Sequence, residues 1–462
     1  MANKPQVDEL SREELIALVL ELQRQIAQLR EENQRLKRSQ RRQAAPFSKE
    51  KPVKDPKKPG RKPGQGPFRY RPVPTVEPNV TVDAQASASC PLCGGALEQD
   101  GVEFATTTDV PEHPKPEVTQ YRIAVCHCRN CGKTVRGTAP GLAADQHGAT
   151  AHRVGPGVMA AAHALHYGVG VPQRKVPGIL KELTGLTITQ SALAQDALRR
   201  AKAEVGAKYQ QLREGIREAP FVHTDDTGWR VGGQSAFLMG FDTDEATIYQ
   251  IRSQHRNEEV REVIPSNYAG VMVSDRGKSY DAKEFDNVAQ QKCLGHILRN
   301  IADVVENQQG RSREFGSKAK ALFQDGMALW RARQSLPEDV FTEKADKLKQ
   351  QVTRHLRNRI LKDDDNQRLL NGLGKQDDDG HLMRFLTAPF VEPTNNRAER
   401  MLRPAVIARK VSQCSKNQEG AEAFAAFTSV AQSALKNGAA TITSAFRLLF
   451  LASTTTSAAQ PQ

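Results

Sequence analysis

The sequence predicts a multidomain α/β protein, and three observations support this fold class. A heptad of leucines marks a long N-terminal helix, two Cys-x-x-Cys-Gly motifs mark a small metal-binding module, and short β-rich runs follow between helical stretches. The 462 residues are enough for several domains. The mean hydropathy is -0.58, no apolar run is long enough to span a membrane, and the polar N-terminus shows no secretory signal. We therefore expect a cytoplasmic protein without a membrane partner.

Residues 8–40 are predicted to form a coiled-coil dimerisation helix. Leucines recur every seven residues, and a second set of positions lies between them: Leu15, Leu22, Leu29 and Leu36, then Val19, Ile26 and Asn33. Leucine in one set and β-branched residues in the other favour a two-stranded coil, and a single asparagine fixes its register. This pattern predicts a homodimer. The alternative is an amphipathic helix that packs on its own chain.

Residues 41–75 are predicted to form a basic arm that binds DNA. The net charge of the chain is +13, and the stretch from Lys37 to Arg71 holds thirteen Lys or Arg against two acids. Proline and glycine keep such a segment extended, and concentrated positive charge indicates a polyanionic partner. Arg61 and Lys62 lie in a GRKPG motif suited to a narrow minor groove. The alternative is a solvated linker.

Residues 76–140 are predicted to form a zinc ribbon. Cys90 and Cys93 form one Cys-x-x-Cys pair, Cys128 and Cys131 form the second, and each pair is followed by glycine. Four thiolates complete a tetrahedral structural Zn²⁺ site, and the glycines let each turn close around the sulfur atoms. One alternative is four reduced cysteines without a metal. In another, Cys126 or His127, beside the second pair, substitutes as a ligand, although the Cys-x-x-Cys spacing favours Cys128.

Residues 141–215 are predicted to be helical. A turn at Gly185 separates two helical patterns, and Thr189 is a candidate N-cap of the second. This arrangement is typical of a helix-turn-helix that reads DNA with polar residues such as Gln190 and Ser191. An ordinary helical hairpin fits the same pattern.

Residues 216–440 are predicted to form a mixed sheet with helices. Short β-rich runs come first, a helical insertion covers about 300–390, and further helices follow. The aspartate runs at 363–365 and 377–379 are interpreted as solvated loops rather than metal sites. Residues 441–462 are assigned to a C-terminal tail, because their end is rich in Ser, Thr and Ala.

Three acidic positions in this region indicate a catalytic metal site. Asp225 and Asp226 are expected at the end of an apolar strand, Asp275 ends another strand, and Glu399 opens a predicted helix. Only one of the two adjacent aspartates can face the same pocket, because strand side chains alternate between faces. Carboxylates that meet at a sheet edge suit two Mg²⁺ ions acting on a phosphodiester. Taken singly, each acid also fits a turn or a solvated helix face.

The order of these modules resembles the insertion-sequence-66 family of bacterial DDE transposases over nearly the whole chain. The matching motifs are GRKPG, CPLCGG with CRNCG, HTDDT, VSDRGKSYD, CLGH and NNRAERMLRPAVIARKVSQCSKNQEGAEAFA. The resemblance implies an RNase H-like catalytic core in which Asp225, Asp275 and Glu399 hold Mg²⁺ or Mn²⁺. The family motif places the metal ligand first in the aspartate pair, which favours Asp225 and leaves Asp226 as the second choice.

The sequence therefore predicts a DNA transposase that exposes 3′-hydroxyls at the ends of its element and joins them to target DNA. Four basic residues near the predicted Glu399 helix are candidate DNA contacts: Arg400, Arg403, Arg409 and Lys410. Asn395 and Asn396 are expected to cap or orient this helix, and His296 is interpreted as a structural histidine. We expect a nucleoid-associated protein, and accessory proteins of the same element are candidate partners. The alternatives are a DNA-binding regulator or domesticated inactive transposase, and a nuclease without joining activity.

Overall fold

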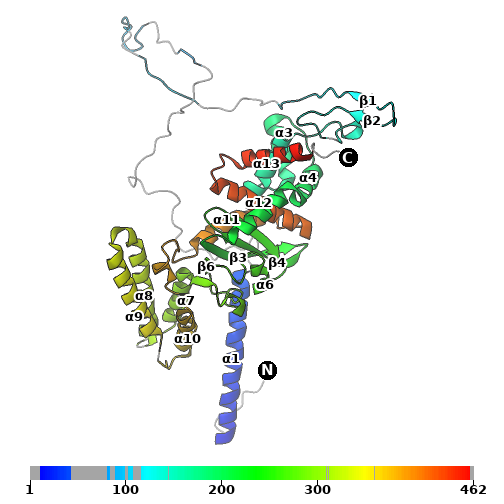
Figure 1. Cartoon of the computed structure of the whole chain (residues 1–462). Helices are drawn as coiled ribbons and strands as arrows, with labels where there is room; N and C mark the ends of the chain where they lie inside the picture. Colours follow the sequence, from blue (N-terminus) through cyan, green and yellow to red (C-terminus); the bar gives the residue numbers. More distant parts are fainter. Residues whose placement is uncertain are drawn as a thin grey trace, which may run out of the picture. The chain divides into compact units, whose positions relative to one another are not determined.

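The structure of the chain is a computed structural model (Figure 1). It describes residues 11–42, 81–83, 89–98, 102–107, 116–143, 145–308, 310, 312–357 and 359–457. Arg61, Lys62 and nearly all of the predicted basic arm lie outside these ranges. The described residues fall into two units whose boundary lies between residues 117 and 118, with 183–185 grouped with the second unit. No helix in this part of the chain is long and apolar enough to cross a membrane.

The N-terminal heptad lies in a single helix, α1 (Arg12–Arg42). The apolar side chains of Val19, Leu22, Ile26 and Leu29 are each about half exposed. The predicted helix is confirmed, whereas its pairing with a second copy stays a prediction. After residue 117, β1 (Val125–His127) pairs with β2 (Thr134–Arg136) in a short antiparallel hairpin.

The region after the hairpin is helical, as the sequence predicts for residues 141–215, and its described residues form four α-helices. Their bounds are α2 (Pro156–His163), continued by the π-helical turn η3 (Ala164–Gly168), then α3 (Val176–Thr184), α4 (Gln190–Lys202) and α5 (Glu204–Ile216). The side chain of Thr189 accepts a hydrogen bond from the Ala192 backbone N–H (3.2 Å), so it caps α4. Gly185 has a φ of +72°, which glycine adopts readily, and it lies in the connection before α4.

A five-stranded mixed sheet forms the centre of the first unit. Its strands are β3 (Phe221–Val231), β4 (Gln234–Asp242), β5 (Thr247–Arg252), β6 (Val271–Ser274) and β7 (Ala289–Lys292), with the short helix α6 (Asn257–Arg261) after β5. The strand order is β5-β4-β3-β6-β7. The first three strands pair antiparallel, whereas β3, β6 and β7 run parallel. This mixed α/β topology is compatible with the core expected of a transposase.

Both faces of the sheet are covered, and the alternation of side chains decides which helices each face contacts. Phe221 and Val273 point to the face that packs on α7 (Leu294–Glu306) and the helical insertion. Val222 and Met272, one residue away on the same strands, point to the opposite face and pack with α5 and α6.

The helical insertion consists of α8 (Ser312–Arg331), α9 (Glu338–Leu356) and α10 (Asp364–Asp378). The interpretation of the two aspartate runs as loops is wrong. Asp363 caps α10 by accepting a hydrogen bond from the Asn366 N–H (2.8 Å), and the second run ends the same helix. Acidic residues are favoured at a helix N-terminus because of the helix dipole, which explains the first run.

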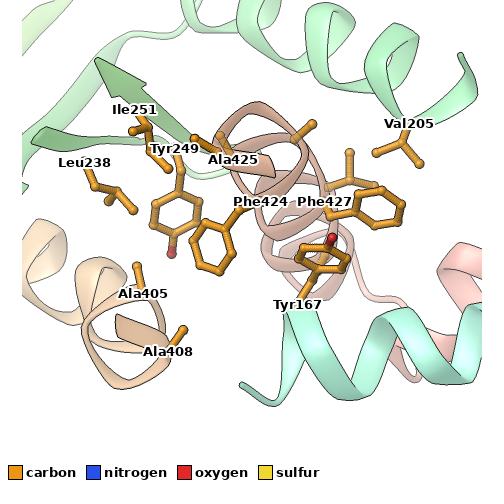
Figure 2. Close-up of a cluster of buried hydrophobic side chains, with 14 of the residues drawn as sticks. Tyr167, Val205, Leu238, Tyr249, Ile251, Ala405, Ala408, Phe424, Ala425 and Phe427 are labelled. Atoms are coloured by element: carbon orange, nitrogen blue, oxygen red, sulfur yellow. The ribbon is translucent and has the colours of Figure 1, made fainter. Parts of the chain in front are cut away.

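Three C-terminal helices close the fold: α11 (Asn396–Ser412), α12 (Gln418–Lys436) and α13 (Ile442–Ser457). Figure 2 shows α12 between Tyr249 of β5 and Tyr167 of η3. The Tyr167 and Phe427 rings stack with their centroids 4.5 Å apart. The helices α2, α4 and α5 and the turn η3 therefore share one core with the sheet and with α11 to α13, whereas α3 packs in a smaller cluster with α2 and α4.

The assignment of residues 441–462 to a tail is also wrong where the structure describes them. Phe446 and Phe450 of α13 are fully buried in the same core. Burying two aromatic rings stabilises a helix whose last turn is rich in Ser and Thr, residues that have only modest intrinsic helix propensity.

Candidate active site

The parallel pairing of β3 with β6 places Asp225 beside Asp275. His223 lies opposite Val273 in this register, and each aspartate comes two residues later on its own chain segment. Side chains two residues apart on a strand share a face. Both carboxylates therefore belong to the face that packs on α7 and α11.

The sequence predicts Asp225 at the end of its strand, and this prediction is wrong. β6 ends at Ser274, but β3 continues for several residues because it stays paired with β4 as far as Val231. Asp225 thus lies within β3, at the level where the neighbouring parallel strand has just ended. Asp275 immediately follows β6, as predicted.

Asp226 points to the opposite face of the sheet. Its Oδ1 lies 3.1 Å from Nδ1 of His255, whereas its backbone N–H donates a hydrogen bond to Oδ1 of Asp225 (2.8 Å). The alternation of strand side chains therefore separates the two aspartates into different environments.

Glu399 lies in the first turn of α11, as predicted. The fully buried Asn395 joins the start of this helix to β3: its Nδ2 donates to the Thr224 carbonyl oxygen (2.8 Å), and its Oδ1 lies 3.0 Å from Nδ1 of His223. Its side chain does not cap the helix. It instead connects the residue before Asp225 with the turn that carries Glu399.

Gly240 allows α11 to approach the sheet closely. It lies opposite Asp225 on β4, and a Cβ atom at this position would lie 2.3 Å from Cε of Met401 and 3.2 Å from Cδ2 of Leu402. A larger residue would displace the side chains of Met401 and Leu402, which lie on the same helix as Glu399. Gly240 was not predicted from the sequence, although a glycine inside a strand pattern often marks a place where another segment of the chain approaches the strand closely.

The three carboxylates act on one another electrostatically. Burial is the main cause that raises the pKa of Asp225 to about 7; the negative charges of Asp275, Asp226 and Glu399 contribute to this rise, and the hydrogen bond from the Asp226 N–H opposes it. Oδ1 of Asp275 accepts a hydrogen bond from the Gly277 N–H (2.8 Å). A cation at this place would relieve the repulsion among the three groups.

Two residues of α7 face the same acids. Arg299 lies 3.4 Å from Glu399 Oε1. Burial lowers the pKa of His296, and its charged form interacts with Asp275 and Glu399. Its Nδ1 is buried without a hydrogen-bond partner in the described part of the chain. The histidine interpreted as structural therefore lies beside the acidic site.

The donor set fits Mg²⁺ or Mn²⁺ in its chemistry, because carboxylate oxygens are the ligands that these hard cations prefer. The raised pKa of Asp225 also fits a site that a cation would neutralise. Among the described residues, no group of three or more His, Cys, Asp or Glu side chains is gathered closely enough to hold a metal ion as it stands.

The two Cys-x-x-Cys-Gly motifs form the same turn. Gly94 donates its N–H to the Cys90 carbonyl oxygen (2.8 Å), and Gly132 donates to that of Cys128 (2.9 Å). Both glycines have positive φ values, +73° and +69°. Hydrogen bonds from the backbone N–H groups that follow lower the pKa of the Cys90 and Cys128 thiols, which favours the thiolate form that binds metals. The two motifs belong to different units.

The four basic candidates on α11 differ in their surroundings. Arg400, Arg403 and Lys410 are exposed. Arg409 is half-buried, and its Nη1 donates hydrogen bonds to Oγ1 of Thr227 (3.0 Å) and to the Gly228 carbonyl oxygen. Arg409 therefore joins α11 to β3.

One family of known proteins matches the part of the chain that carries these residues. The model of the family described as "Transposase IS66 family" matches residues 152–423, which is more than half of the chain. A comparison with curated proteins found no match. The matched range includes every strand of the five-stranded sheet, the helical insertion, and all three acidic positions.

Proposed function

The chain belongs to the IS66 family of transposases, and we propose that it binds the ends of its mobile element, cleaves phosphodiester bonds to expose 3′-hydroxyls, and joins them to target DNA. The observation that carries this proposal is the interaction of Asp275 and Glu399 with the partly buried carboxylate of Asp225. These acids come from three distant parts of the chain. A protein that only binds DNA has no need for such a costly concentration of negative charge.

We propose that Asp225, Asp275 and Glu399 hold Mg²⁺ or Mn²⁺. Bound there, such ions supply activation of the attacking hydroxyl or water and stabilisation of the leaving oxygen. The protein contributes the positions of the ligands. Asn395 fixes the turn of Glu399 against β3, and Gly240 permits the close packing of α11. Arg299 and the neutral His296 are suited to contact a phosphate beside the acids.

The proposal is tested by strand transfer from a labelled, pre-cleaved element end with a free 3′-hydroxyl into a plasmid, with Mg²⁺ or Mn²⁺. A joined product that requires the metal is the expected result. DNA binding without a product, also after the other proteins of the element are added, would favour the regulator or the inactive transposase. Cleavage without joining would favour the nuclease.

We propose that Cys90, Cys93, Cys128 and Cys131 hold one structural Zn²⁺. The matching turns and lowered thiol pKa values of the two motifs support this assignment. Metal analysis of the purified protein is expected to give one zinc per chain, and Cys131→Ser is expected to lose it, because three thiolates bind zinc much more weakly. Cys126→Ser is the matched control, since Cys126 is an exposed thiol next to the second motif. Equal zinc content in both variants would contradict the proposed ligand set.

We propose that α1 pairs with its copy in a homodimer, which would bring two element ends into one complex. The half-exposed apolar stripe of α1 supports this proposal. Deletion of residues 1–40 is expected to convert a dimer into a monomer in sedimentation velocity. A dimer that persists after the deletion would contradict the coiled-coil assignment.

The exposed Arg400, Arg403 and Lys410, together with the predicted basic arm, are the proposed contacts to DNA phosphates.

A further inference from the structure

Lys292, at the end of β7, is a fully buried lysine that belongs to none of the sites above. Its Nζ forms an ion pair with Oδ1 of Asp281 (2.8 Å) and hydrogen bonds with Oε1 of Gln290 (2.7 Å) and Oγ of Ser274 (3.3 Å). The ammonium group thus donates two hydrogen bonds, to Gln290 and Ser274, and its contact with Asp281 is an ion pair.

Two of the three partners lie on either side of Asp275. Ser274 directly precedes it, and Asp281 follows it by six residues in the same loop. The Ser274 hydroxyl also donates to the Asp275 carbonyl oxygen (3.0 Å), and the Cys293 N–H donates to the Ser274 carbonyl oxygen (2.8 Å). The segment that carries Asp275 is thus held at both ends by the terminus of β7.

The same segment is attached to the helical insertion. Nε2 of Gln376, on α10, donates to Oδ2 of Asp281 (3.2 Å), and the Lys292 N–H donates to the His381 carbonyl oxygen (2.8 Å). The guanidinium of Arg276, next to Asp275, packs so closely on α10 that a Cβ at Gly372 would lie 2.5 Å from it. Lys292 is therefore the point where β7, the insertion and the Asp275 loop meet.

Burying a lysine is expensive, and an apolar residue of similar volume often stabilises a fold better than a buried ion pair does. The partners of Lys292 lie on either side of Asp275, a proposed metal ligand. Residues that do not bind a metal themselves but hold a metal ligand in its orientation occupy positions of this kind. We propose that Lys292 is a positioning residue that holds Asp275 in the orientation needed for metal binding. This inference rests on the proposed function.

The test is the substitution Lys292→Met in the full-length protein. It is expected to raise the Mn²⁺ concentration needed for half-maximal strand transfer, and the midpoint of the Mn²⁺-induced rise in melting temperature, by about 10–100-fold. DNA affinity is expected to stay unchanged. The melting-temperature measurement does not depend on turnover, and a lysine with a purely structural role would lower stability without moving either midpoint.

Gln291→Leu is the matched control. Gln291 is the fully buried neighbour of Lys292 on β7. Its side chain bonds to the Leu382 carbonyl oxygen and the Phe385 N–H in the segment after α10, and to the backbone carbonyl oxygen of Lys292 but not to its ammonium group. This control removes a buried polar group from the same strand without touching Ser274 or Asp281. It is expected to lower stability but to leave both Mn²⁺ midpoints in place.

Asp281→Asn is the second variant, because Asp281 is partly exposed and asparagine removes the negative charge of the ion pair with Lys292 while keeping the size of the side chain. It is expected to shift both midpoints in the same direction by a smaller factor. Normal midpoints in Lys292→Met, or in Asp281→Asn if the first variant does not fold, would overturn the inference. An equal shift in Gln291→Leu would overturn it as well. A wild-type protein that responds to Mn²⁺ in neither measurement would overturn the proposed function, and the inference with it.

Discussion

Replacing Glu399 with Gln is expected to reduce strand transfer by about 10³-fold or more. The residues of a catalytic unit act together, so the loss of one of them removes most of the rate enhancement that the whole unit provides. Glutamine keeps the size of the side chain and the fold of α11 but removes the negative charge that a divalent cation requires. Affinity for element-end DNA is expected to stay within a few-fold of wild type, because Glu399 is an acidic residue and does not attract phosphate. The measurements are the rate of joined product and DNA binding at the same salt concentration.

Glu419→Gln provides the matched control for this prediction. Glu419 occupies the first turn of α12, as Glu399 occupies that of α11, and it pairs with a basic residue, Lys202, at the protein surface (2.7 Å). Its substitution is expected to leave joining unchanged. Full activity in Glu399→Gln would contradict the role proposed for this carboxylate, and loss of DNA binding would indicate a folding defect instead.

Replacing Asp225 with Asn is expected to abolish joining and, at the same time, to stabilise the metal-free protein at pH 8. The pKa of Asp225 is about 7 in the folded chain, against about 3.9 in an unfolded chain. The folded state therefore binds more protons between these values, and its stability falls as the pH rises from about 4 to about 7. Asparagine removes this penalty, with an expected gain on the order of 1–3 kcal/mol at pH 8.

The measurement is the melting temperature of both proteins at pH 5 and pH 8. The gain of Asp225→Asn over wild type should be larger at pH 8, because at pH 5 the wild-type carboxyl is still protonated in the folded state. Mn²⁺ should raise the melting temperature of wild type but not that of the variant. Asp226→Asn, which loses the contact with His255 on the other face, should show no such gain. A gain that is the same at both pH values would contradict the raised pKa of Asp225.

Many local features of this protein could be predicted from its sequence. The heptad predicts α1, and Thr189 caps α4 as expected. Both Cys-x-x-Cys-Gly motifs form turns in which glycine adopts positive φ. These features depend on residues a few positions apart, so periodicity, capping and turn chemistry are sufficient to predict them.

The errors arose where packing or pairing with another element outweighed the local composition of a segment. Ser- and Thr-rich residues suggested a tail, but the burial of Phe446 and Phe450 against the core makes α13 a helix. The acids in HTDDT suggested a strand end, but pairing with β4 extends β3 to Val231. Local composition does not reveal the contacts of α13, because its partners lie far away in the sequence. By contrast, β4 follows β3 directly after the Gly232-Gly233 turn, which is a local hairpin signal.

The sequence by itself determined the family resemblance, the three acids as candidates, and the local elements that carry them. Only the tertiary structure decided how these acids are held. The bonds of Asn395 to β3, the close approach of α11 at Gly240, and the contacts of Lys292 with both sides of Asp275 join segments far apart in the chain. They depend on strand register and helix packing, which form only when the whole chain buries its apolar surface, and a linear pattern does not encode them at any single position.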